Sequence, residues 1–271
     1  MTIDNKSEPG SWQREIDAAP WHYKPITIDA TVPAKDPNAR GGVRRYLDTV
    51  KPEEYVPNVG EVDLTELSLQ GLADLYGSDK GTIKHNYTMY YEYIIQDILD
   101  TAYGGRDRKS ACLSIVEAGV ACGASLRMWA NYLPASVIVG YDIRPECAKL
   151  CEGLHNVEIR IEDLCKKKMA EEVDLFIDDA SHIAEEMVAM FQNCFKNVAE
   201  GGYYVIEDLG CTYNPAYTEQ FRKYFNPAAV NSRGEILKLM DYLMQEVDHK
   251  NEIAEIRYCP QMLVIKRAYG S

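Results

Sequence analysis

Residues 113–143 read LSIVEAGVACGASLRMWANYLPASVIVGYDI, and this stretch decides the fold class. An apolar run ends at Glu117, glycines follow at Gly119 and Gly123, and a run with helical spacing precedes a second apolar run that ends at Asp142. Runs that are apolar throughout are typical of strands buried on both faces of a parallel sheet. The stretch therefore predicts a strand, a glycine turn, a helix and a second, parallel strand.

The same alternation of strands and helices continues toward the carboxyl terminus. Three more strands and two more helices are predicted, at residues 157–163, 173–180 and 201–208 and at residues 145–154 and 182–198. The end differs, because apolar runs at residues 252–258 and 262–268 flank Cys259 and Pro260 closely and predict an antiparallel hairpin. The sequence therefore predicts an α/β fold with a doubly wound, mostly parallel, seven-stranded sheet and an antiparallel carboxyl-terminal hairpin.

The amino-terminal part of the chain has a different character. Up to about Gly60 it is rich in proline, charged residues and isolated aromatics, and no helical or strand period persists. Regular structure is predicted to begin near Asp63, with a helix that Asp63 opens and Gly77 closes. We therefore divide the chain into an irregular amino-terminal arm, residues 1–62, and one α/β domain, residues 63–271.

Charge and composition limit the partners of the protein. Lys and Arg number 29 against 42 Asp and Glu, so the formal net charge of −13 repels phosphate backbones and anionic lipid. No apolar run reaches the about 18 residues that a membrane span needs, and the amino terminus lacks the pattern of a secretory signal. Eight cysteines without a C-x-x-C pair predict reduced thiols. We expect a cytoplasmic protein that binds neither nucleic acid nor membrane.

Carboxylates lie at the carboxyl end of every predicted parallel strand, where ligands bind in such sheets. They are Glu117, Asp142, Glu162, Asp163, Asp178, Asp179, Glu207 and Asp208. Core packing does not explain this set, because unpaired carboxylates repel one another and are costly to desolvate. The sequence therefore predicts the functional site at this edge.

The first part of this edge has the pattern of a nucleoside site. Gly119 and Gly123 would let a ligand approach the backbone, and Asp142 follows Gly119 at the spacing of an acid that binds ribose hydroxyls. The motif is G-x-x-x-G and lacks the glycine spacing that seats a pyrophosphate. An adenosine without phosphates, such as S-adenosylmethionine, therefore fits better than NAD, and Asp163 is expected on the adenine side.

The second part has the pattern of a metal site. Asp179 and His182 follow one strand, Glu207 and Asp208 follow another, and neighbouring strands are about 4.8 Å apart. Three hard oxygen donors beside one histidine suit Mg²⁺ or a similar divalent cation. Such a metal would acidify a substrate hydroxyl, and His182 would accept its proton. The alternative is that His182 opens its helix and the two acids solvate a loop.

Five motifs together resemble a known family. They are LYGSDKGTIKHNYTMYYE, VEAGVACGASLRMWANYLP, VGYDI, DLFIDDASH and GGYYVIEDL, between Leu72 and Tyr217. They are similar to metal-dependent class I methyltransferases that O-methylate sugars, such as the macrolide deoxysugar enzymes of the mycinamicin type and mycobacterial methylmannose polysaccharide enzymes. The resemblance implies a Rossmann-like methyltransferase domain, which we assign to residues 63–271, although the arm before Gly60 and the segment after Tyr217 lie outside the resemblance.

The resemblance also implies roles for single residues. S-adenosylmethionine would contact Thr88, Gly119, Gly123, Ala124, Ser125 and Asp142, and we add Asp163 and Asp178 at the same edge. Mg²⁺ or a similar cation would bind Asp179, Glu207 and Asp208, and His182 would be the base. Ala118 and Ala180 depart from the family pattern, where a larger aliphatic residue and a glycine are usual, but neither touches an expected ligand. The loop at residues 209–217 diverges more, and we expect the acceptor there.

The expected activity is O-methylation of a sugar or glycoside hydroxyl in polysaccharide or natural-product biosynthesis, by a homo-oligomer. Tyrosines near the expected mouth would stack on the sugar or pack in the core: Tyr87, Tyr90, Tyr91, Tyr213 and Tyr217. Four alternatives stay open at this point. They are methylation of a phenol or catechol oxygen, methylation of an amino-sugar nitrogen, a nucleotide-dependent oxidoreductase, and a binding module without catalysis.

Overall fold

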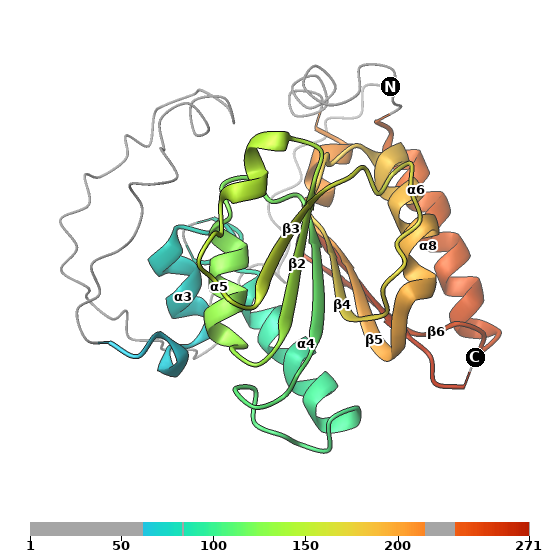
Figure 1. The fold of residues 1–271 in the computed structure, drawn as a ribbon. Coiled ribbons are helices and arrows are strands. Elements are labelled where there is room, and N and C mark those ends of the chain that lie inside the picture. Colours follow the sequence, from blue (N-terminus) through green and yellow to red (C-terminus); the bar gives the residue numbers. More distant parts are fainter. Residues whose placement is uncertain (1–61, 83, 215–230, 271) are drawn as a thin grey trace, which may run out of the picture. The chain divides into compact units, whose positions relative to one another are not determined.

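The computed structural model describes residues 62–82, 84–214 and 231–270. The predicted arm, residues 1–62, therefore lies outside the described residues except for Val62. The sheet has seven strands in the order β3-β2-β1-β4-β5-β7-β6 (Figure 1). The strands are β1 (Ser114–Ala118), β2 (Val137–Asp142), β3 (Val157–Ile161), β4 (Val173–Asp178), β5 (Val198–Ile206), β6 (Ile253–Cys259) and β7 (Met262–Arg267).

The pairing of the strands confirms the predicted topology. Strands β1 to β5 pair in parallel, and β7 pairs antiparallel with both β5 and β6. The chain order reverses between β1 and β4, so a crevice is expected at the carboxyl ends of these two strands. The predicted doubly wound sheet with a carboxyl-terminal hairpin is therefore present.

Helices cover both faces of the sheet. They are α3 (Leu69–Tyr76), α4 (Thr88–Thr101), α5 (Ala124–Tyr132), α6 (Ala184–Cys194) and α8 (Arg233–Asp248). Figure 1 shows α3, α4 and α5 on one face and α6 and α8 on the other. Alternation along β4 divides the core accordingly, because Leu175 and Ile177 belong to one buried cluster and Phe176 to the other. The continuous apolar pattern of the strands thus reflects two cores.

Three predicted element limits were wrong. Asp63 caps a separate 3₁₀ turn, Leu64–Glu66, and the α3 helix starts only after Ser68, whose hydroxyl accepts a hydrogen bond from the Gly71 N–H at 3.0 Å. The predicted helix at residues 145–154 is a 3₁₀ helix, Pro145–Lys149, followed by turns. Strand β5 begins at Val198, within the segment predicted as helix.

Two expectations about composition can be compared with the structure. All eight cysteines are free, as the spacing predicted. Among the described residues, no helix is long and apolar enough to cross a membrane.

Candidate active site

Backbone hydrogen bonds between neighbouring strands align their carboxyl ends. The Gly119 N–H donates to the Tyr141 carbonyl at 2.8 Å, the Asp179 N–H to Ala118 at 2.9 Å, and the Glu207 N–H to Asp178 at 3.0 Å. These bonds continue the sheet one residue beyond β1, β4 and β5. Asp179 after β4 and Glu207 after β5 therefore lie side by side, as predicted for the carboxyl ends of parallel strands, and both contact the Lys80 ammonium.

At the predicted nucleoside end, Asp142 joins β2 to the turn after β1. One of its oxygens accepts a hydrogen bond from the Val120 N–H at 3.0 Å, and Arg144 donates to both oxygens, from Nε at 3.0 Å and from Nη2 at 2.9 Å. Burial alone would raise the pKa of Asp142, but the hydrogen bonds from Arg144 and Val120 lower it below its ordinary value. Asp142 is therefore ionised and already fixed in place.

The glycine turn has a structural reason that the sequence did not reveal. Gly119 has a φ of +97°, and a Cβ atom there would lie 2.1 Å from the Asp179 carbonyl oxygen. A side chain at residue 119 would therefore collide with the backbone after β4. Gly123 has a φ of +75° and precedes α5, which begins with Ala124 and the buried Ser125. Contact of these residues with a cofactor stays a prediction.

The structure also places the remaining predicted cofactor residues. Thr88 is the first residue of α4, is buried, and donates from its hydroxyl to Gln70. Asp163 lies after β3 and pairs with the exposed Lys166 at 2.6 Å. Asp178 ends β4, and burial raises its pKa to about 7. None of these contacts tests the predicted roles.

Three predicted residues lie together as a candidate cation site. Asp179, His182 and Asp208 each offer one ligand atom, and these atoms lie within 4.8 Å of one another. The His182 Nε2 atom is 3.8 Å from Asp179 Oδ1 and 3.9 Å from Asp208 Oδ2. Burial lowers the pKa of His182 below its ordinary value, so the imidazole is neutral at neutral pH.

Backbone geometry at this cluster is unusual. His182 and Asp208 have φ angles of +55° and +53°, in the left-handed region. This conformation costs about 1–2 kcal/mol for a residue with a Cβ atom. Asp208 lies two residues after β5, and His182 lies four residues after β4, just before α6. Such strain is concentrated at functional sites in proteins.

The fourth predicted residue, Glu207, has protein partners on both oxygens. The Lys80 ammonium lies 2.8 Å from Oε2, and the Tyr91 hydroxyl donates to Oε1. Burial raises the pKa of Glu207 to about 7. The predicted role of Glu207 as a metal ligand stays a prediction.

Lys80 is a site residue that the sequence analysis missed. Its side chain is fully buried, and its ammonium contacts Asp179 Oδ2 at 2.6 Å, Glu207 Oε2 at 2.8 Å and Glu117 Oε1 at 3.3 Å. Burial alone would lower the pKa of Lys80, but these three carboxylates raise it well above its ordinary value. A charged side chain is almost never fully buried unless it is paired. Glu117, which lies within the buried strand β1, was therefore the one sign in the sequence that a cationic side chain is buried beside the strands.

Two of the predicted mouth tyrosines hold carboxylates instead. Tyr87 and Tyr91 are buried, and their hydroxyls donate to Asp208 Oδ1, at 2.9 Å, and to Glu207. Of the two alternatives that the sequence left open, contact with a sugar or packing in the protein, the burial of both side chains favours packing. Tyr213 is exposed, Tyr217 lies outside the described residues, and contact of either with an acceptor stays a prediction.

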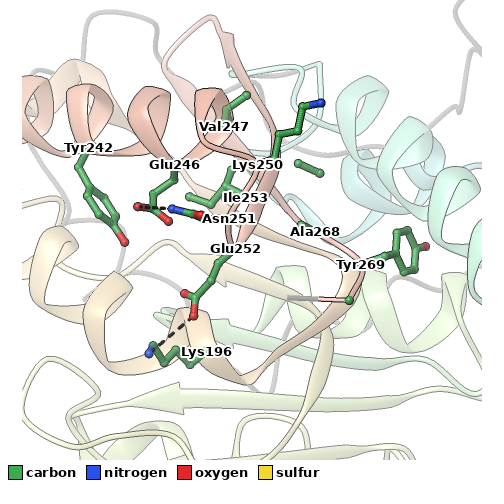
Figure 2. Close-up of a pocket in the computed structure, with 12 residues that line it drawn as sticks. Lys196, Tyr242, Glu246, Val247, Lys250, Asn251, Glu252, Ile253, Ala268 and Tyr269 are labelled. Carbon is green, nitrogen blue, oxygen red and sulfur yellow. Dashed lines mark hydrogen bonds and ion pairs between the residues drawn. The ribbon is translucent and has the colours of Figure 1, made fainter.

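A pocket lies at the opposite edge of the sheet. Its volume is about 760 Å³, and its lining includes Tyr242 and Glu246 of α8, Ile253 of β6 and Lys196 just before β5 (Figure 2). Within it, Lys196 pairs with Glu252 at 3.7 Å, as Figure 2 shows. The pocket adjoins the amino end of β5, whereas the acidic site lies at the carboxyl ends of β4 and β5, so the two are separate.

Comparison with solved structures defines the class of fold. The MycE methyltransferase of the mycinamycin biosynthetic pathway, in complex with Mg, SAH and mycinamycin VI, superposes with a TM-score of 0.58 at 21% identity, covering 76% of this chain and 56% of that one. A second crystal form with Mg and SAH has a TM-score of 0.60 at 21% identity, covering 74% and 54%. The protein therefore has the Rossmann-like fold of class I methyltransferases.

Sequence comparison adds particular relatives, although no protein-family model matches the chain. The chain is 34% identical over 160 residues to the 8-demethyl-8-alpha-L-rhamnosyl tetracenomycin-C 2'-O-methyltransferase of Streptomyces olivaceus, covering 55% of this chain and 39% of that protein. It is 32% identical to the L-olivosyl-oleandolide 3-O-methyltransferase of Streptomyces antibioticus, with the same coverage. The chain therefore spans about two-fifths of the length of these relatives, and it is similar to sugar O-methyltransferases over that part.

Proposed function

We propose that this protein is an S-adenosylmethionine-dependent and Mg²⁺-dependent O-methyltransferase that acts on a hydroxyl of a sugar or glycoside. The observation that carries the proposal is the convergence of Asp179, His182 and Asp208 at the strand ends, beside the turn that Asp142 holds. The names of the sequence relatives support a sugar hydroxyl as the acceptor.

The donor set at this edge fits a hard divalent cation. Asp179 and Asp208 offer carboxylate oxygens, which Mg²⁺ prefers, and the predicted third carboxylate, Glu207, is adjacent in sequence. When bound there, Mg²⁺ would lower the pKa of a coordinated acceptor hydroxyl. The imidazole of His182 is then left for proton transfer, since nitrogen is a poorer ligand for this ion.

The residues of the chain supply the remaining parts of the mechanism. His182 is neutral at neutral pH and would take the acceptor proton at Nε2, the nitrogen nearest both carboxylates. When bound, S-adenosylmethionine would supply the methyl group to the acceptor oxygen and would be left as the neutral thioether S-adenosylhomocysteine. The glycine turn, Ser125 and Asp142 would hold the nucleoside, and the left-handed backbone at His182 would fix the base beside the acceptor.

The proposal is tested by release of S-adenosylhomocysteine with a panel of acceptors. Glycosides that carry rhamnosyl or olivosyl groups should be methylated with Mg²⁺ and not after treatment with a chelator. Methylation of catechol alone would support the phenol alternative, and turnover that resists the chelator on amino sugars would support N-methylation. Nicotinamide binding would support the oxidoreductase, and cofactor binding without turnover on any acceptor would support the binding module.

Substitution of the base separates its two possible roles. General-base help contributes about 10²–10⁴-fold, so His182→Ala should lower turnover by that factor while affinity for S-adenosylhomocysteine is unchanged. Binding of Mn²⁺ to the same variant shows whether His182 is also a ligand. Near-normal turnover of His182→Ala at neutral pH would contradict the assignment. The homo-oligomer and the cytoplasmic location stay predictions, which light scattering and cell fractionation would test.

A further inference from the structure

The two carboxylates of the candidate cation site divide their oxygens in the same way. Asp179 turns Oδ1 toward His182 and places Oδ2 against the Lys80 ammonium at 2.6 Å. Asp208 turns Oδ2 toward His182, and its Oδ1 accepts the Tyr87 hydroxyl at 2.9 Å and faces His85 Nε2 at 3.4 Å. In each acid one oxygen is held by the protein and the other faces the site.

The groups that hold these oxygens come from the α3–α4 loop and the start of α4, residues 77–91, of which the structure describes 77–82 and 84–91. Internal hydrogen bonds shape the loop: the Ser78 N–H donates to Ala73 at 2.8 Å, and the Thr88 N–H donates to the Lys80 carbonyl at 3.2 Å. Gly81 packs so closely that a Cβ atom would lie 2.5 Å from an oxygen of Asp74. Lys80 is therefore carried by a defined loop and projects into the strand ends.

Lys80 also links the strand ends to one another. Glu117 belongs to β1, Asp179 follows β4 and Glu207 follows β5, so one ammonium bridges acids from three strands. Glu117 is itself fixed, because the Trp129 indole donates to its Oε2 at 2.9 Å. Glu117 of β1 and Trp129 of α5, both buried, thus help to fix the position of the ammonium.

We propose that Lys80 is a positioning residue of the cation site. Its ammonium holds Asp179 Oδ2 and Glu207 Oε2, so that Asp179 Oδ1 faces the bound cation. Ligating carboxylates are commonly fixed by such outer partners, whose loss costs about 10–100-fold in metal affinity. The inference rests on the proposed function, because it requires that a cation binds between Asp179 and Asp208. It goes beyond that function by assigning part of the cation affinity to a residue that is not a ligand.

A competing role makes the opposite prediction. An ammonium beside two acids also repels a divalent cation, since both carry positive charge. If Lys80 acted as a resident cation that the metal must displace, its removal would strengthen metal binding. If it only neutralised buried acids for folding, its removal would weaken the protein and leave the metal affinity of the folded fraction unchanged.

The test measures Mn²⁺ affinity by electron paramagnetic resonance in the presence of S-adenosylhomocysteine. Lys80→Met should bind Mn²⁺ about 10–100-fold more weakly than the wild type, with unchanged affinity for S-adenosylhomocysteine. Lys84→Met is the matched control, because Lys84 lies in the same loop, is 55% exposed and pairs with Asp79. It removes the same charge without an ion pair to Asp179 or Glu207. Because the charge of Lys84 also acts through space on Asp208 and Asp179, its removal should not weaken Mn²⁺ binding.

Equal or tighter Mn²⁺ binding by folded Lys80→Met would overturn the inference, as would an equal loss in Lys84→Met. Absence of Mn²⁺ binding by the wild type would instead overturn the proposed function.

A second measurement, on the wild-type sequence, tests the inference even if Lys80→Met does not fold. With ¹⁵N-lysine incorporated, bound Mn²⁺ should show a hyperfine coupling to a lysine nitrogen, and this coupling should persist in Lys84→Met. A missing coupling would show that Lys80 leaves the site when the cation binds, and it would overturn the inference.

Discussion

Replacing Gly119 by alanine tests whether the close approach of β1 and β4 builds the site. The new Cβ atom would lie 2.1 Å from the oxygen and 2.7 Å from the carbon of the Asp179 carbonyl, and 3.0 Å from the Ala180 Cα atom. All three are backbone atoms, so no side chain can rotate away and the end of β4 must shift. Because Asp179 belongs to the site, this shift should displace the candidate cation ligand.

The expected cost has two parts. A left-handed alanine costs about 1–2 kcal/mol, and forcing an extra carbon into a packed region costs about 1–3 kcal/mol. Gly153→Ala is the matched control, since Gly153 has a φ of +94° and a Cβ atom there would meet nothing within 4 Å. Gly119→Ala should therefore be less stable than Gly153→Ala by about 1–3 kcal/mol, the packing part alone.

Urea denaturation measures this difference, and Mn²⁺ titration measures its effect on the site. For a protein of this size each kcal/mol lowers the melting temperature by about 2–4 °C, so calorimetry provides a second readout. Gly119→Ala should lose Mn²⁺ affinity, whereas Gly153→Ala should keep it. Equal stability of the two variants, or full Mn²⁺ affinity in Gly119→Ala, would refute the claim that backbone contact at residue 119 sets the position of Asp179.

Two further predictions concern single carboxylates. Because the folded pKa of Asp142 is lowered, its ionised form stabilises the fold above the unfolded pKa of about 3.9, and this stability is lost as pH falls through the lower folded pKa. In urea titrations below about pH 5, the stability of Asp142→Asn should therefore decline less steeply with falling pH than that of the wild type. Parallel curves would contradict the pairing of Asp142 with Arg144. Tyr91→Phe removes the hydroxyl that donates to buried Glu207 and should lower the free energy of unfolding by about 1–3 kcal/mol. Tyr93→Phe, at an exposed tyrosine of the same helix, should change it by no more than about 0.5 kcal/mol. Equal losses of the two variants in urea denaturation would contradict the buried hydrogen bond.

The alternation of strands and helices and the acidic edge were predictable because both follow from local patterns. Continuous apolar runs identify strands that are covered on both faces, and a parallel sheet brings all their carboxyl ends to one edge. The proximity of Asp179, His182 and Asp208 can therefore be predicted without knowing how the side chains pack. Helix limits were less predictable, because Asp63 and Ser68 are both good capping residues and each caps its own turn.

The outer groups of the site were not predictable from local patterns. Lys80 is separated from its partners Asp179 and Glu207 by 99 and 127 residues, and a polar loop with several charges gives no sign of which one is buried. Tyr87 and Tyr91 pose the same problem, since their spacing fits both a core helix and an exposed mouth. Only the packing of residues 77–91 onto the strand ends distinguishes these readings.

The charge of the edge explains why a sulfonium cofactor and a divalent cation suit this site better than a dinucleotide. Glu117, Asp179, Glu207 and Asp208 lie in or beside the site, and the Lys80 ammonium offsets one of these charges. At the nucleoside end, Arg144 is committed to Asp142. A pyrophosphate would add negative charge where carboxylates already repel one another, whereas Mg²⁺ and a sulfonium would reduce that repulsion. In the proposed methyl transfer the sulfonium would become a neutral thioether, so this attraction would favour S-adenosylmethionine over S-adenosylhomocysteine.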